Sequence, residues 1–239
     1  MLNNPVRRTP CPSSIGEAMK TTIIILIVLL AIAIVGGCVF SRRRGKADVL
    51  HLTAKLPGKA VIVYYSQSKV RNTAVVAGWI QKQLGCEMIA VEPVEPYPEA
   101  YSQTLKVATQ ERKDGTQRAV KPTPPLDEYD IVFIGSPIWY GTYASPMATF
   151  LKEHPMAGKT LVPFSTHGGG GAPLFEEDLR KACPDATVLK GFTARGSNQI
   201  ERRLNVGVSS HHTENDVVEW LNGLFPETDN TQNKGEQDK

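Results

Sequence analysis

The sequence predicts an α/β fold in which helices flank a doubly wound parallel sheet of five strands. Residues 60–65 and 131–134 form uninterrupted apolar runs, as is typical of central parallel strands that are covered on both faces. Other segments carry apolar residues at helical spacing, and these segments alternate with the expected strands along the chain. Such alternation favours right-handed crossovers and therefore one parallel sheet.

The expected elements follow from local patterns. Val76, Ile80 and Leu84 are spaced four residues apart, which predicts an amphipathic helix that begins near Thr73. Gly135 and Pro137 are expected to end the central strand. We expect strands at residues 59–65, 86–91, 131–134, 160–165 and 187–192, and helices at residues 73–84, 100–112, 145–153, 172–182 and 215–224.

The charge is unevenly distributed along the chain. The net charge is +3, yet residues 1–56 hold eight basic and two acidic side chains, whereas residues 57–225 hold 17 basic and 18 acidic ones. The body of the chain therefore gives no case for nucleic-acid binding. The four cysteines show neither CxxC pairs nor His/Cys metal spacing, so we expect neither a disulfide framework nor a metal site.

A long apolar run lies near the N-terminus. Residues 21–41 contain no charged side chain and show no polar face, and about 20 apolar residues are enough to span a bilayer as a helix. We therefore expect an N-terminal tail at residues 1–20, a transmembrane segment or lipoprotein signal at 21–41 and a basic juxtamembrane linker at 42–58. A domain at 59–225 and a disordered tail at 226–239 are expected to follow.

Two kinds of membrane attachment fit this run. Three arginines at residues 42–44 follow it, and a basic excess on that side favours a single-pass anchor with the domain in the cytoplasm. Residues 35–38, Val-Gly-Gly-Cys, also resemble a bacterial lipobox, which implies export and a lipid on Cys38. The arginines oppose export, so the anchor is favoured and the lipoprotein stays open.

A polar loop at residues 66–73 connects the first expected strand to its helix. The N–H groups at a helix N-terminus attract anions, and short hydroxyl, amide and guanidinium side chains can donate to phosphate oxygens. A helix cap with a polar lead-in is the alternative. The candidate cofactor-binding residues of this loop are Ser66, Gln67, Ser68, Arg71, Asn72 and Thr73.

Two further loops follow expected strands. Residues 135–141 carry two large rings that suit a flat aromatic ligand, although the same rings can instead cap the core. Residues 166–171 include four consecutive glycines, which let a backbone approach a ligand closely. Ligands of open α/β sheets bind at the carboxyl ends of strands. The candidate cofactor-binding residues here are Pro137, Ile138, Trp139, Tyr140, Gly141, Thr166, His167, Gly168 and Gly169.

In this order, the three loops resemble those of the flavodoxin family over about residues 59–224. Residues 65–73 resemble the family's phosphate loop, and residues 135–141 and 163–169 resemble its two isoalloxazine loops. The resemblance implies the strand order 2-1-3-4-5, FMN as the cofactor and redox chemistry carried by the flavin. One departure is that Lys-Val-Arg at residues 69–71 stands where the family usually has a glycine, so we expect Arg71 to replace part of the backbone contacts.

The leading interpretation is a membrane-tethered FMN redox protein. It is either an electron carrier for a redox partner protein or an NAD(P)H-dependent reductase of a small acceptor such as a quinone. The altered phosphate loop favours an alternative, a cofactor-free scaffold or interaction module at the membrane. Hydrolysis by Ser66 or Ser165 ranks low because neither lies in a GxSxG elbow. No catalytic acid or base is assigned, since a structural role in its loop suits His167 at least as well.

Overall fold

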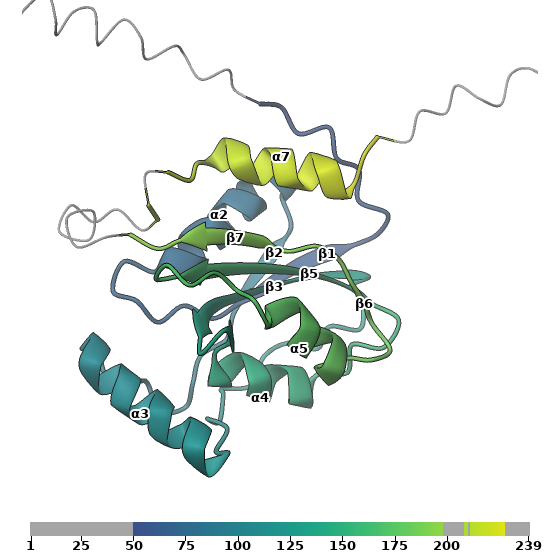
Figure 1. Ribbon diagram of the computed structural model, residues 1–239. Coiled ribbons are helices and arrows are strands. Elements are labelled where there is room, and N and C mark those ends of the chain that lie inside the picture. Colours follow the sequence, from purple (N-terminus) through teal and green to yellow (C-terminus); the bar gives the residue numbers. More distant parts are fainter. Residues whose placement is uncertain (1–49, 198–207, 210, 228–239) are drawn as a thin grey trace, which may run out of the picture. The chain divides into compact units, whose positions relative to one another are not determined.

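A computed structural model describes residues 50–197, 208–209 and 211–227 (Figure 1). The strands are β1 (Ala60–Tyr64), β2 (Glu87–Ala90), β3 (Ile131–Trp139), β4 (Thr142–Tyr143), β5 (Thr160–His167), β6 (Thr187–Val188) and β7 (Phe192–Arg195). The helices are α2 (Asn72–Leu84), α3 (Tyr101–Asp114), α4 (Ser145–Glu153), α5 (Phe175–Ala182) and α7 (Glu214–Leu224).

The sheet follows the predicted topology. Its main path is β2-β1-β3-β5-β6, and all pairs along this path are parallel. Counted as parallel strands in chain order, this is the predicted order 2-1-3-4-5. The strand order reverses between β1 and β3, which is the switch point where folds of this kind bind ligands.

The central strand β3 is longer than predicted, because Gly135 and Pro137 do not end it. The carbonyl of Gly135 accepts a hydrogen bond from the N–H of Tyr65 at 2.9 Å, so Gly135 faces β1. Pro137 lies two residues further and faces the same side, where β1 has already ended. Its missing N–H therefore costs no hydrogen bond of the sheet. A Cβ at Gly135 would meet the Phe164 ring at 2.1 Å, so glycine allows close packing there.

The predicted strand at 187–192 is instead two short strands, and both pair with β5. Strand β6 pairs with the start of β5 and β7 with its end. On β5, Pro163 lies between the residues that pair with β6 and those that pair with β7. It faces the same side of the strand as Leu161, whose carbonyl accepts a 2.9 Å hydrogen bond from the N–H of Leu189. Proline has no N–H to donate, so the pairing is interrupted at this position.

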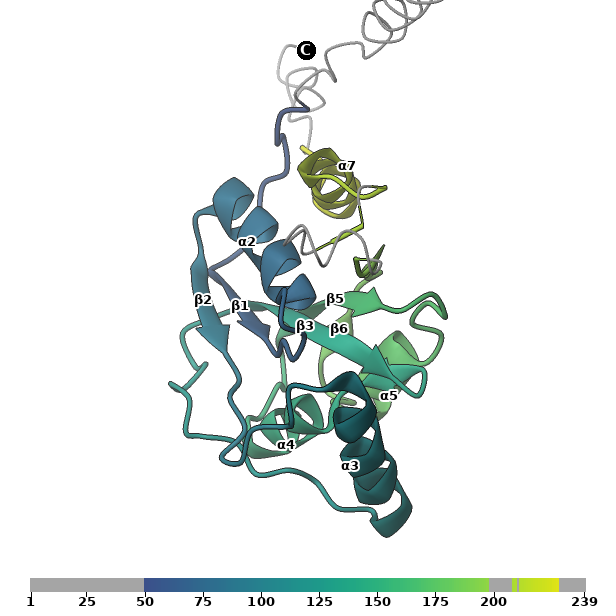
Figure 2. The same ribbon diagram turned by 90° about the vertical axis from the view of Figure 1, so that its left-hand side faces the viewer.

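Helices cover both faces of the sheet, as predicted. Figure 1 shows α2 and α7 on one face and α4 and α5 on the other. Buried residues on the first side include Ile80, Phe164 and Leu221, and those on the second include Phe150 and Leu179. Helix α3 lies on the side of α4 and α5 but farther from the sheet, as both Figure 1 and Figure 2 show.

The predicted membrane segment at 21–41 lies outside the described residues, as do the N-terminal tail and most of the C-terminal tail. Within the described part of the chain, no helix combines the length and the apolarity needed to cross a bilayer. Membrane attachment therefore stays a prediction from the sequence.

Candidate functional site

Three loops meet at the carboxyl edge of β1, β3 and β5, which are neighbours in the sheet. The phosphate loop (residues 66–73) and the glycine-rich loop (residues 166–171) are joined by a buried hydrogen bond of 2.9 Å between Thr73 Oγ1 and Thr166 Oγ1. The end of β7 also reaches this place, because a Cβ at Gly196 would lie 2.7 Å from Asn72 Nδ2. The structure thus brings together predicted residues that are more than 90 positions apart in the sequence.

Two serines of the phosphate loop cap the N-terminus of α2. Ser68 Oγ accepts a hydrogen bond from the N–H of Asn72 at 3.0 Å, and Ser66 Oγ accepts a longer one, 3.4 Å, from the N–H of Ala74. A hydroxyl that accepts such a bond still has its own hydrogen to donate. The two serines can therefore cap the helix and contact a phosphate at the same time.

Arg71 is the residue that precedes α2, and its backbone is left-handed, with φ of 54° and ψ of 46°. Glycine adopts this conformation freely, whereas other residues are strained in it by about 1–2 kcal/mol. Arg71 thus stands at a position whose backbone shape suits glycine better than arginine. Its guanidinium forms no ion pair with any described carboxylate. Burial raises the pKa of Tyr65, and the charge of Arg71 acts against this rise.

The side chain of Gln67 is committed to the fold. Its Oε1 accepts a 2.6 Å hydrogen bond from the Tyr65 hydroxyl, and its Nε2 donates to the carbonyl of Pro98 at 3.2 Å. These bonds connect the phosphate loop to the segment that leads into α3. Gln67 therefore stabilises the loop through these two bonds. Its amide makes no hydrogen bond to Thr73 or Thr166.

The aromatic loop is a β-hairpin, which the sequence analysis did not predict. Tyr140 and Gly141 have φ of 53° and 89°, and they connect β3 to the antiparallel strand β4 as a two-residue turn. Ser136, which was also not predicted, supports this hairpin: it is fully buried, and its Oγ accepts a 2.9 Å hydrogen bond from the N–H of Ala144. The sequence signal was weak because Tyr-Gly is a poorer marker of such turns than Asn-Gly.

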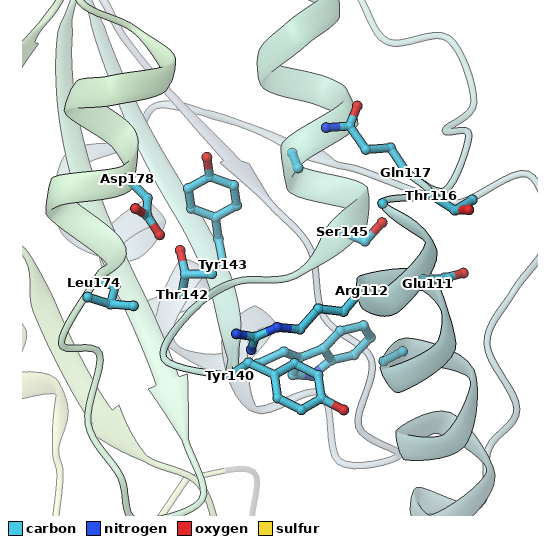
Figure 3. Close-up of a pocket in the computed structure, with 14 residues that line it drawn as sticks. Glu111, Arg112, Thr116, Gln117, Tyr140, Thr142, Tyr143, Ser145, Leu174 and Asp178 are labelled. Atoms are coloured by element: carbon cyan, nitrogen blue, oxygen red, sulfur yellow. The ribbon is translucent and has the colours of Figure 1, made fainter.

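The two rings of the hairpin have different surroundings. Trp139 is half-buried and packs edge to face on Tyr97, with ring centroids 4.9 Å apart, and on Tyr65 at 6.0 Å. Tyr140 is 40% exposed, shares a hydrogen bond with the Thr109 hydroxyl and lies 4.7 Å below the guanidinium of Arg112 (Figure 3). Trp139 therefore serves the core at least in part, whereas Tyr140 faces α3.

A cavity of about 370 Å³ lies between the hairpin, α3 and α5 (Figure 3). Trp139 and Tyr140 line it, together with Arg112 on α3 and Asp178 on α5. Thr142 lines it too, and its Oγ1 is buried without a hydrogen-bond partner among the described residues. The volume falls within the range of small-molecule sites. Nothing in the sequence singled out the residues that α3 contributes, because their place beside the hairpin depends on where the helix packs.

The glycine-rich loop is organised by His167. Its Nδ1 accepts hydrogen bonds from the N–H groups of Gly169 at 2.9 Å and Gly171 at 3.1 Å. Backbone N–H groups can only donate, so Nδ1 carries a lone pair and the ring proton lies on Nε2. Burial, followed by the charges of His212 and Arg195, holds the pKa of His167 below its usual value. The imidazole is therefore neutral at pH 7.

The family of the chain is established by comparison with known proteins. A family model described as flavodoxin matches residues 59–206, so the chain belongs to the flavodoxin family. This membership agrees with the predicted fold and supports FMN, the predicted cofactor. A search of curated proteins finds no match.

Several solved structures are similar to the chain. A candidate flavoprotein from Bacteroides eggerthii DSM 20697 is 27% identical, with a TM-score of 0.57, and the match covers 70% of this chain and 98% of that one. A candidate flavoprotein from Bacteroides uniformis ATCC 8492 is 24% identical, with a TM-score of 0.51 and coverage of 62% and 96%. A flavoprotein from Lactobacillus acidophilus NCFM, solved in complex with FMN, is 22% identical, with a TM-score of 0.48 and coverage of 62% and 97%.

Proposed function

We propose that this protein is a membrane-tethered FMN-binding redox protein. The observation that carries the proposal is the buried bond between Thr73 and Thr166, which joins the phosphate loop to the glycine-rich loop at the switch point of the sheet. One ligand with a phosphate at one end and a flat ring at the other suits this arrangement. Membership of the flavodoxin family supports FMN as that ligand.

The residues present fit FMN. At the phosphate end, Ser66 and Ser68 have hydroxyl hydrogens to donate, and Arg71 brings a cation that has no described carboxylate partner. At the ring end, the hairpin offers the ring of Tyr140, which is 40% exposed. Bound FMN supplies the capacity to accept and donate electrons, and the chain binds it, orients it and sets its electrostatic surroundings.

The direct test is a visible spectrum of the purified protein with added FMN. We expect one FMN per chain, with its fluorescence quenched. Tyr140→Ala and Trp139→Ala should each weaken binding and restore part of the fluorescence, because an aromatic pair contributes about 0.5–1.5 kcal/mol beyond buried area. Binding and quenching that are unchanged in both variants would place the two rings outside the flavin site.

A cofactor-free scaffold is the alternative function, and the altered phosphate loop was its main support. The left-handed backbone of Arg71 weakens this support, because a position that would suit glycine is left-handed here although arginine stands at it. Failure to take up FMN at micromolar concentration would favour the scaffold.

The cavity beside the hairpin favours a reductase over an electron carrier. A reductase needs room for a small acceptor next to the flavin, and Trp139 and Tyr140 line both the predicted flavin site and this cavity. Filling the cavity by Leu174→Trp should lower the rate of NAD(P)H-dependent quinone reduction and leave FMN content unchanged. Leu105→Trp is the matched control, since Leu105 is similarly exposed, at 43% against 42%, and does not line the cavity. Equal rates in the two variants would favour the carrier.

The tether is proposed from the sequence of residues 21–41. The full-length chain should stay in the membrane fraction after a carbonate wash, and deletion of residues 1–46 should release the domain. The mass of the mature protein separates the two kinds of attachment: an intact N-terminus indicates the anchor and a cytoplasmic domain, whereas a chain that begins at lipid-modified Cys38 indicates an exported lipoprotein. A full-length chain that is released by the wash would contradict both.

A further inference from the structure

His167 occupies the last position of β5, and its ring turns back over the loop that follows. One atom, Nδ1, accepts from both Gly169 and Gly171, at 2.9 and 3.1 Å. These two glycines have φ of 138° and 69°, so the loop has a shape that other residues adopt only with strain. Two backbone N–H groups of the loop therefore depend on a single lone pair.

The imidazole divides the N–H groups of the loop into two sets. Those of Gly169 and Gly171 are held by His167. Those of Gly168 and Gly170 have no acceptor among the described residues, and both glycines are exposed. Two donors in an exposed part of the loop are thus left without a described acceptor.

We propose that His167 is a positioning residue whose neutral imidazole locks the glycine-rich loop and presents the N–H groups of Gly168 and Gly170 to the flavin. Protonation of Nδ1 removes the acceptor of both loop bonds and releases the loop. Flavin affinity therefore falls as the pH drops through the pKa of His167. The proposal rests on the proposed function, since it takes the flavin as the ligand of this loop.

The groups around His167 disfavour its protonation, so the two bonds from Gly169 and Gly171 are kept at neutral pH. The groups of the described chain that act on the imidazole are Arg195, its register partner on β7, and His212, which precedes α7. Both disfavour a further positive charge, and partial burial disfavours it as well. Release is therefore expected only below about pH 6.5, the usual pKa of histidine.

Riboflavin is the probe for the test, because the phosphate of FMN itself has a pKa near about 6. Its affinity for the full-length protein in detergent is measured at about pH 7.5 and about pH 5. Loss of the two backbone hydrogen bonds that hold the loop predicts binding about ten-fold weaker at the lower pH. An affinity that is equal at the two pH values would overturn the proposal.

Three variants separate the imidazole from other titrating groups. In His167→Asn, the side-chain Oδ1 takes the place of Nδ1 and accepts without titrating, so affinity should stay within about three-fold of the parent at pH 7.5 and lose its pH dependence. His167→Gln has no acceptor at that position and should bind weakly at both pH values. His212→Asn should keep the pH dependence with a higher midpoint, because one opposing charge is gone. Persistence of the pH dependence in His167→Asn would refute the role of His167.

Amide hydrogen exchange in the flavin-free protein tests the lock independently of the ligand. The protection factors of Gly169 and Gly171 should fall at about pH 5 in the parent, stay high in His167→Asn and be low throughout in His167→Gln. Protection factors that change neither with pH nor in His167→Gln would show that His167 does not hold the loop. If protection behaves as expected but neither riboflavin nor FMN binds at any pH, the proposed function fails, and the flavin-positioning role of His167 fails with it.

Discussion

The phosphate loop and the glycine-rich loop lie at the same edge of the sheet, yet their conformations are maintained by different chemistry. In the phosphate loop, Ser66 and Ser68 accept from amides of α2, and hydroxyls do not titrate near neutral pH. In the glycine-rich loop, His167 accepts from Gly169 and Gly171, and an imidazole does titrate there. The comparison predicts that mild acid leaves the conformation of the phosphate loop unchanged and alters that of the glycine-rich loop.

The two loops also differ in the residue that occupies a left-handed position. The glycine-rich loop uses glycine at the left-handed position 171, whereas the phosphate loop uses Arg71 and is strained by about 1–2 kcal/mol. A charged side chain at a strained position suggests that its charge serves the ligand at that end.

The largest effect is expected for Arg71→Ala. A charge-assisted hydrogen bond contributes about 1.5–3 kcal/mol, so the affinity for FMN should fall roughly ten- to a hundred-fold. Riboflavin, which lacks the phosphate, should bind as before. Titration of both ligands against Arg71→Ala and against Lys69→Ala, the exposed neighbouring cation, provides the measurement. Equal losses for both ligands, or a loss for neither, would remove the phosphate role of Arg71.

The hydrogen bond between Thr73 and Thr166 should have nearly as large an effect, in this case on stability. Thr73→Val leaves the buried Thr166 hydroxyl without its partner, so the free energy of unfolding should fall by about 1–3 kcal/mol. The double replacement of Thr73 and Thr166 by Val should recover part of this loss, because no buried hydroxyl is then left unpaired. Urea unfolding of the parent, both single variants and the double variant gives the coupling energy. Additive losses would show that the two loops are independent.

Backbone strain at Arg71 predicts a smaller effect, a difference in the free energy of unfolding between two variants of this residue. Arg71→Gly and Arg71→Ala both lack the cation and should bind FMN equally weakly. The glycine variant should nevertheless be more stable by about 1 kcal/mol in the absence of flavin, because alanine remains strained at positive φ. Urea unfolding of the two variants measures the difference. A more stable alanine variant would contradict the left-handed conformation.

The smallest effect is expected for stability as a function of pH. Burial, followed by electrostatic interaction with His212 and Arg195, lowers the pKa of His167, so the folded protein favours the neutral ring. This contribution to stability is complete above about pH 6.5 and is lost as the pH falls through the lowered pKa. The free energy of unfolding should therefore decrease more between about pH 7.5 and 5 in the parent than in His167→Asn. A larger decrease in the variant would reverse the predicted sign.

Most of the fold could be predicted from the sequence, because apolar runs and helical periodicity are local signals. Helix α4 was predicted with its observed bounds, and β1 and α2 to within one residue. The extension of β3 through Pro137 could not be predicted. It depends on which side the proline faces and on where β1 ends, and both are facts of the folded sheet.

The site was predictable in its loops and less so in its contacts. The serines, Thr73 and Thr166 could be found because strand ends meet at one edge of a parallel sheet. The contacts of Tyr140 with Thr109 and Arg112 could not, since they depend on where α3 lies. A structural role of His167 in its own loop was expected as one of two possibilities, but the two amides from which its ring accepts depend on the folded loop.

The measurement that tests the central claim most directly is a titration of the isotope-labelled protein, followed through the amide NMR signals of the two loops. If one FMN lies across both loops, FMN should shift the signals of residues 66–73 and 166–171 together, saturating at one equivalent, whereas riboflavin should shift those of 166–171 and leave 66–73 almost unchanged. If saturating FMN leaves either loop unshifted, the two loops do not hold opposite ends of one flavin, and the account is contradicted.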